Sequence, residues 1–171
     1  MQELGAVRNA LNAGELDGPL KGLLCHDLAA GRKRVAELLD GFQKTFGAGE
    51  DTPVTLCSAP GRTEICGNHT DHQHGRVLAG AVDLDFLACA APNGTNTIRF
   101  QSQGWPLVEV ELDTLEPREE EKESTASLGR GMAAQAAQRG YPVSGFDVYA
   151  TSEVLPGSGL SSSAACEVLL G

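Results

Sequence analysis

Hydrophobic side chains recur at helical spacing in two segments of this 171-residue chain. In residues 27–46 they follow one another every three or four positions, and Gly47 stands where a C-cap glycine is expected. A second such segment, residues 128–137, is stopped by Gly140 and Pro142. The pattern predicts two amphipathic helices, with apolar faces formed by Leu28, Val35, Leu38, Leu39, Phe42 and Phe46 in the first and by Leu128, Met132, Ala133, Ala136 and Ala137 in the second.

Short β-prone runs between and after these helices predict a sheet. Residues 107–112 and 146–151 alternate apolar and polar positions, as half-buried strands do. Three further runs are residues 54–58, closed by Ala59-Pro60-Gly61, residues 77–91, which are long enough for a strand or a strand pair, and residues 97–103, which follow an Asn-Gly turn signal. The order of elements indicates an α+β fold, with helices packed on a mainly antiparallel sheet.

The first 26 residues are mixed and glycine-rich. We expect them to form an N-terminal extension with little organised structure. The domain itself is expected to comprise residues 27–171, since the regular patterns begin at Asp27.

Charge and cysteine content narrow the classes of partner and compartment. The formal net charge of −10 disfavours binding to nucleic acids, whose phosphates it would repel. Residues 116–123 hold five of the acidic side chains and are expected to form a solvated surface segment.

The five cysteines are scattered and include no C-x-x-C pair, so we expect neither a disulfide framework nor a zinc knuckle, and a reducing cytoplasm fits best. No signal peptide is indicated, and the most apolar stretch, residues 86–91, is too short to span a bilayer.

A glycine- and serine-rich segment, residues 156–165, follows the last predicted strand and leads into an apolar helix. Its glycines permit a positive φ and a close approach of the backbone to a ligand. Free N–H groups and the positive end of the helix dipole would then face a phosphate group. The segment lacks the lysine and the spacing of a Walker P-loop. Phosphate binding and a simple Gly/Ser linker both remain open from the residues alone.

A second constellation, residues 61–75, concentrates an arginine, carboxylates, amides and three imidazoles between two apolar runs. Carboxylate, amide and imidazole groups match the hydroxyls of a sugar, and Arg62 would suit the negative charge of a transferring phosphoryl group. A metal site built on the histidines and Asp71 is an alternative, and so is a merely solvated polar loop.

Taken together, the two segments resemble the signatures of the GHMP small-molecule kinases, and of galactokinases in particular. Residues 61–72, Gly-Arg-Thr-Glu-Ile-Cys-Gly-Asn-His-Thr-Asp-His, are similar to the first family signature, G-R-x-N-[LIV]-I-G-[ED]-H-x-D-Y. Residues 156–164 are similar to the second, in which a proline and glycines precede L-S-S-S-A. The resemblance implies a fold like that of ribosomal protein S5 domain 2, as in the N-terminal domain of GHMP kinases.

The resemblance also implies an activity and a set of site residues. Galactokinases transfer the γ-phosphoryl group of ATP to the anomeric hydroxyl of galactose, with Mg²⁺ as cofactor. By position, Arg62 would be catalytic, and Asn68, His69 and Asp71 would bind the sugar. Ser163 would be the magnesium ligand, and the triphosphate would be bound by Gly157, Ser158, Gly159, Leu160, Ser161, Ser162 and Ser163.

Two departures from the family pattern shape the expectation. Asn68 replaces the usual sugar-binding acid, which keeps open a kinase for another sugar, such as a uronic acid, arabinose or an N-acetylhexosamine. The chain ends at Gly171, before the family's catalytic aspartate and C-terminal domain, so we expect a truncated domain that is inactive alone. A non-catalytic galactose sensor is a further alternative. Self-association is expected through an apolar face left uncovered, formed by Cys166, Val168, Leu169 and Leu170.

Overall fold

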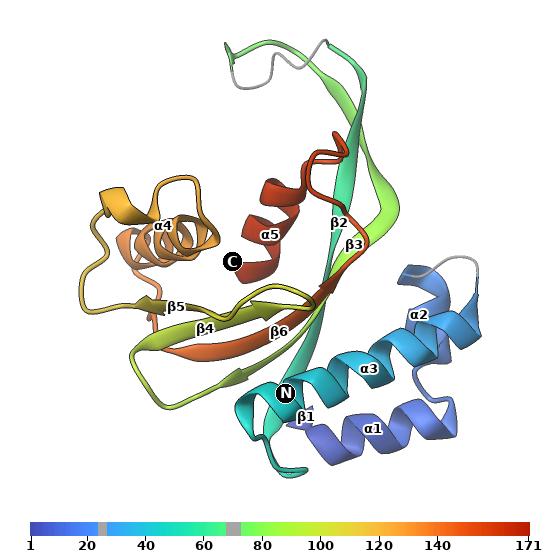
Figure 1. Ribbon diagram of the computed structural model, residues 1–171. Coiled ribbons are helices and arrows are strands. Elements are labelled where there is room, and N and C mark those ends of the chain that lie inside the picture. The colour runs from blue at the N-terminus through green and yellow to red at the C-terminus, as the bar shows by residue number, and fades with distance from the viewer. Residues whose placement is uncertain (24–26, 68–72) are drawn as a thin grey trace.

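The computed structural model describes residues 1–23, 27–67 and 73–171, which form one six-stranded sheet with helices on both faces (Figure 1). The strand order is β1-β2-β3-β6-β4-β5, and every neighbouring pair is antiparallel except β4 and β6. The α+β class with a mainly antiparallel sheet is thereby confirmed. The strands are β1 (Gln2–Glu3), β2 (Pro53–Cys66), β3 (Leu78–Pro92), β4 (Thr97–Ser102), β5 (Val108–Glu111) and β6 (Phe146–Ser152). The helices are α1 (Leu4–Ala13), α2 (Asp17–Leu23), α3 (Leu28–Phe46), α4 (Thr125–Gln138), α5 (Ser162–Leu170) and the short 3-10 helix η2 (Glu119–Glu121).

Helix α3 has the boundaries that its sequence predicts. The carboxylate of Asp27 accepts hydrogen bonds from the backbone N–H groups of Ala29 and Ala30, which have no partner within the helix. At the other end Gly47 adopts the left-handed conformation, with φ of 67°, and its N–H group donates to the carbonyl of Gln43.

Strand β3 separates two hydrophobic cores. Its odd-numbered side chains, Leu87, Cys89 and Ala91, pack with α1 and α3, whereas Phe86 and Ala88 pack with α5 on the other face. Because both faces of the strand are covered over residues 86–91, that part of its sequence is a continuous apolar run and does not alternate. A third cluster joins α4 to β4 and β5 through Ala133, Ile98 and Val110.

The N-terminal segment is better ordered than its sequence suggests. Instead of a poorly organised extension, it forms β1, α1 and α2, and Leu4, Val7 and Leu11 are buried in the same core as α3. The three side chains are spaced at i, i+3 and i+7, which is a helical pattern, and Gly14 caps α1 in the left-handed conformation. The expectation therefore failed because the surrounding glycines were given more weight than this spacing.

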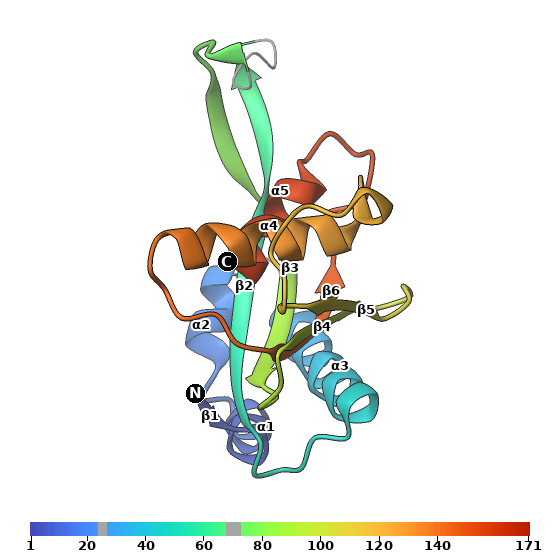
Figure 2. The same cartoon turned by 90° about the vertical axis from the view of Figure 1, so that its left-hand side faces the viewer.

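Strand β2 is also longer than expected. It continues past Ala59-Pro60-Gly61 to Cys66 with a register shift between Pro60 and Arg62, and pairs with β3 in a hairpin that extends well beyond the rest of the sheet (Figures 1 and 2). A proline and a bulge are both tolerated in a strand at the sheet edge. On its outer side, the described part of the chain pairs β2 only at Pro53 and Val54.

Two surface expectations are corrected. Cys166 does not lie on an uncovered face but is buried against the sheet, with Leu169 and Leu170 packed beside it, so only Val168 stands exposed. Within the acidic segment, Glu121 is not merely solvated, because it forms a bidentate pair with the buried guanidinium of Arg130, whose hydrogen bonds hold the pKa of Glu121 below its ordinary value. In the described part of the chain, no helix is long and apolar enough to cross a membrane.

Gly41 in α3 gives a test of this packing. A methyl group at that position would overlap the ring of Tyr149 on β6, so we expect Gly41→Ala to lower the free energy of unfolding by about 1–3 kcal/mol. Gly131 in α4 is the matched control, because nothing lies within 4 Å of the same added methyl group, and Gly131→Ala should stabilise the protein by up to about 1 kcal/mol through helix propensity. Urea denaturation of both variants measures the difference, and equal effects would contradict the close contact of α3 with the sheet.

Candidate functional site

The segment that joins β6 to α5 folds back on itself. The hydroxyl of Ser152 accepts a hydrogen bond from the N–H group of Val154 at 3.1 Å, and Val154 is fully buried. Farther on, the hydroxyl of Ser158 donates to the carbonyl of Leu155 at 2.7 Å. Gly157 and Gly159 have φ of 75° and 76°, a region that favours glycine. Residues 153–161, which we call the Gly/Ser loop, are thus an ordered turn with its own hydrogen bonds and do not resemble an extended linker.

Ser161 ends this loop in an unusual conformation. It is the N-cap residue of α5 and has φ of 59°, which is uncommon for a residue other than glycine. Its carbonyl accepts the first helical hydrogen bond, from Ala165, while its hydroxyl accepts a hydrogen bond from Nε of Arg62 at 3.3 Å. Residues other than glycine that are held in this conformation cost free energy, and they cluster at functional sites.

The two motifs singled out in the sequence meet at this point. The backbone N–H group of Arg62 donates to the carbonyl of Leu160 at 2.9 Å, so that β2 and the Gly/Ser loop are joined by backbone as well as side chain. Gly61 makes this approach possible, because an added Cβ would lie 3.1 Å from both the carbonyl oxygen of Leu160 and a methyl carbon of Val154. The approach brings a guanidinium group to the N-terminus of α5, where the helix dipole is also positive. Such an arrangement suits an anionic ligand.

A groove of about 560 Å³ adjoins the start of α5. Its lining includes Phe86, Phe100 and Trp105, and Ser162 and Ser163 line it from the first turn of α5. Trp105 is the one tryptophan of the chain, and its side chain is 61% exposed. Cys166 also lines the groove, and burial raises the pKa of its thiol to about 11, so that the thiol stays protonated at neutral pH. The groove therefore offers apolar walls next to polar groups that could hold phosphate.

The structure locates only part of the predicted site. Arg62 lies half-buried in β2, and the residues expected to bind phosphate lie in the Gly/Ser loop and the first turn of α5. Asn68, His69 and Asp71, expected to bind sugar, lie outside the described residues. Three of the four groups considered for the alternative metal site, His69, Asp71 and His72, lie there too, and residues 1–23, 27–67 and 73–171 contain no cluster of three or more His, Cys, Asp or Glu side chains that could hold a metal ion.

Two features of the site were not anticipated from the sequence. Trp105 lies in a turn after β4, and its only sequence signal is that it follows Gly104 and precedes Pro106, away from any apolar pattern. Gly61 was read as the end of a strand, whereas it is the position at which β2 touches the Gly/Ser loop. The sequence signal for such a close backbone contact is a glycine next to a predicted functional arginine.

Comparisons with known proteins bear on the same segments. A family model described as the galactokinase galactose-binding signature matches residues 40–92. The galactokinase of Ligilactobacillus salivarius is 33% identical over 136 residues, which cover 77% of this chain and 34% of that protein. The galactokinase of Bacillus subtilis is 32% identical over 139 residues, which cover 79% and 35%. The chain spans about a third of the length of the relatives it matches.

Solved structures agree with the sequence comparisons. The crystal structure of Lactococcus lactis galactokinase complexed with galactose superposes with a TM-score of 0.69 and 28% identity, over 80% of this chain and 35% of that one. A mevalonate kinase from Methanococcus jannaschii superposes with a TM-score of 0.56 over 69% of this chain and 38% of its own, but at 15% identity this likeness concerns the fold alone. The resemblance drawn from the two sequence motifs is confirmed, as is the GHMP-kinase type of fold.

The contact at Gly61 is testable by substitution. A methyl group there must displace either the carbonyl of Leu160 or the side chain of Val154, so we expect Gly61→Ala to cost about 1–3 kcal/mol of stability. Gly80→Ala is the matched control in the same hairpin, because its added methyl group would find its nearest neighbour at 3.7 Å, an ordinary contact. Chemical denaturation provides the measurement, and a Gly61 variant as stable as the Gly80 variant would show that the loop does not rest on β2.

Proposed function

Because the chain resembles the N-terminal portion of the galactokinases in both sequence and fold, we propose that it forms the nucleotide- and sugar-binding part of an ATP-dependent galactokinase. The reaction breaks the bond between the γ-phosphorus of ATP and its bridging oxygen and forms a bond to the anomeric oxygen of galactose. Its products are ADP, galactose 1-phosphate and the proton of the hydroxyl.

The observation that carries the proposal is the contact between Arg62 and Ser161 at the start of α5. A triphosphate needs positive charge and several N–H or O–H donors, since phosphoryl transfer depends mainly on positioning and charge stabilisation. We assign the donors to the segment from Gly157 to Ser163, which is the end of the Gly/Ser loop and the first turn of α5, and Arg62 supplies a full charge on the side facing β2. Within this segment the N–H groups of Ser158 and Leu160 already donate inside the loop. We assign Arg62 the stabilisation of the transferring phosphoryl group.

The groove beside α5 suits the rest of the nucleotide. Its aromatic and apolar walls match a planar base, and stacking on an exposed ring such as Trp105 contributes about 1–3 kcal/mol per base. Ser163 lines this groove with its hydroxyl, a hard oxygen donor of the kind that Mg²⁺ takes together with phosphate oxygens. A bound Mg²⁺ would neutralise phosphate charge there, and Ser163 is the residue of this chain that would hold it.

The sugar is assigned to residues of the segment that follows β2 in the sequence. The galactose-binding signature covers residues 40–92, which include Asn68, His69 and Asp71, and the Lactococcus lactis relative was solved with galactose. We propose these three side chains as hydrogen-bonding partners of the sugar hydroxyls, with Arg62 acting between the sugar and the phosphates held by the Gly/Ser loop. The cysteines in the described part, which are all free thiols, suit a reducing cytoplasm.

Nucleotide binding by the 171-residue chain tests the proposal directly. We expect Mg-ATP to change the fluorescence of Trp105, the only tryptophan, and Arg62→Gln to weaken Mg-ATP about tenfold, since a charge-assisted hydrogen bond contributes about 1.5 kcal/mol or more. Arg139→Gln is the matched control, because Arg139 is exposed at the end of α4 and does not line this groove. Titration without any fluorescence change and without heat of binding would reject the assignment of a nucleotide site.

Sugar specificity and turnover complete the test. We expect galactose to bind more tightly than its 4-epimer glucose, measured by calorimetry. A coupled assay for ADP is expected to show negligible turnover by the 171-residue polypeptide alone, because the matched residues make up only about a third of the relatives and the walls that exclude water from the substrates need more of that length. Equal affinity for the two sugars would contradict the assignment of galactose as the substrate. Turnover at about 1–100 per second, the range of typical kinases, would contradict the expectation that this polypeptide alone is inactive.

A further inference from the structure

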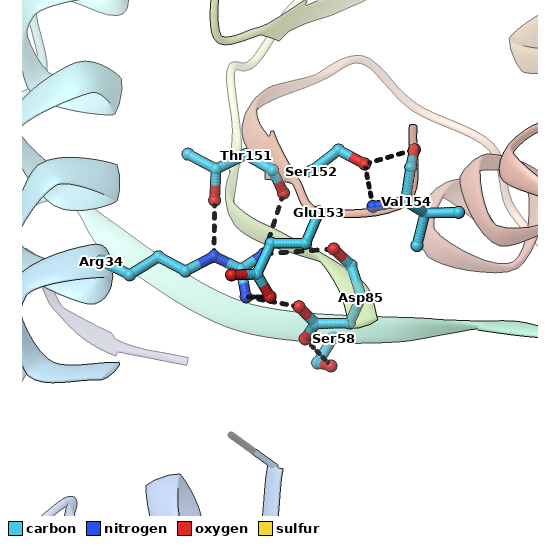
Figure 3. A network of polar contacts seen from close by, with 7 residues as sticks. All are labelled: Arg34, Ser58, Asp85, Thr151, Ser152, Glu153 and Val154. Atoms are coloured by element: carbon cyan, nitrogen blue, oxygen red, sulfur yellow. Dashed lines mark hydrogen bonds and ion pairs between the residues drawn. The ribbon is translucent and has the colours of Figure 1, made fainter. Parts of the chain in front are cut away.

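Arg34 of α3 reaches the sheet from the face opposite the groove. Its guanidinium group is 13% exposed and forms hydrogen bonds with three residues of the sheet and of the loop after it (Figure 3). Nη1 donates to a carboxylate oxygen of Asp85 at 2.5 Å and to Glu153 at 3.1 Å. Nη2 donates to the carbonyls of Asp85 and Thr151, at 3.1 and 3.3 Å, and Nε donates to the hydroxyl of Thr151 at 3.3 Å.

These contacts lie where the three central strands separate. The pairing of β3 with β6 ends at Phe86 and Ser152, so Thr151 lies just within the paired stretch and Asp85 just outside it. From this point β6 leaves the sheet as the Gly/Ser loop, whereas β2 and β3 continue as the hairpin (Figure 1). We call this point, marked by Ser58, Asp85 and Thr151, the fork. Asp85 links the strands there, because its carbonyl also accepts a hydrogen bond from the N–H group of Glu153 at 3.0 Å and its second carboxylate oxygen accepts one from the hydroxyl of Ser58 on β2.

The fork is only a few residues away from the site on both branches. Arg62 follows Ser58 by four positions on β2, and Val154, which touches Gly61, follows Thr151 by three. A guanidinium group is planar and presents its donors in a fixed geometry, so Arg34 fixes the two backbone carbonyls and the carboxylate of Asp85 relative to one another. Asp85 has a side chain only 4% exposed, so it cannot exchange this partner for water.

We propose that Arg34 is a positioning residue for the phosphate-binding site, one that holds the branch carrying Arg62 and the branch carrying the Gly/Ser loop at a fixed separation from behind the sheet. The inference rests on the proposed nucleotide site. It differs from a purely structural role in one respect: loss of the geometry disturbs contacts with the triphosphate, which Arg62 and the Gly/Ser loop make together, and leaves the stacking of the base on Trp105, in the turn after β4, unchanged.

The experiment compares the affinities of Mg-ATP and adenosine for three variants of the 171-residue chain. Arg34→Lys can keep the ion pair with Asp85 but cannot form the other contacts at once, and Arg34→Met removes all of them. Arg32→Met is the matched control, since Arg32 lies on the same helix and is ion-paired at 2.5 Å, but to Asp17 of α2. We expect both Arg34 variants to bind Mg-ATP about tenfold more weakly with adenosine affinity unchanged, and Arg32→Met to match the unchanged chain.

Each outcome decides the question. An Arg34→Lys variant that binds Mg-ATP as the unchanged chain does would overturn the positioning role, and so would an equal loss of affinity for Mg-ATP and adenosine, which indicates general loosening. Should Arg34→Met fail to fold, Arg34→Lys decides alone. If the unchanged chain binds no Mg-ATP, the proposed function is rejected first, and this inference with it.

Discussion

The approach of β2 to the Gly/Ser loop is the constraint on which the arrangement of the site depends. A hydrogen bond from the backbone of Arg62 to Leu160 and another from its side chain to Ser161 join segments 99 residues apart in sequence. The glycine at position 61 leaves room for both, since an added Cβ would lie 3.1 Å from the carbonyl oxygen of Leu160 and would have to push it back. Any ligand that uses both segments must therefore fit a separation set by backbone atoms, which shift far less readily than side chains.

The remainder of the fold keeps this separation. On one face of the sheet α5 packs against Phe86 and Ala88, and on the other α3 packs against Leu87 and Cys89, so β3 is held between two cores. Closely packed protein interiors transmit the displacement of one element to its neighbours and do not absorb it. The N-terminal helices consequently contribute to the site although none of the predicted site residues lies on them.

Elements with a strong local pattern could be predicted from the sequence, and contacts between distant segments could not. The capped helix α3 and the strands from Leu78 onward follow directly from periodicity and turn residues. The passage of β2 through Pro60 was missed because a proline ends a strand locally, whereas an edge position tolerates it. Trp105 was missed for a different reason: the groove that it lines is formed by β4, α4 and the Gly/Ser loop together, and no single segment carries that information.

The strand order has a consequence for how the chain is assembled. Strand β6 is the last in sequence, yet it lies between β3 and β4, so the sheet consists of two separate halves until residue 152 is available. During synthesis from the N-terminus, β3 and β4 would each present an unpaired edge from residues 92 and 102 until β6 begins at residue 146, and such edges associate readily with other strands. The segment that completes the sheet also leads directly into the Gly/Ser loop, so the loop can take its final shape only in the closing step of folding.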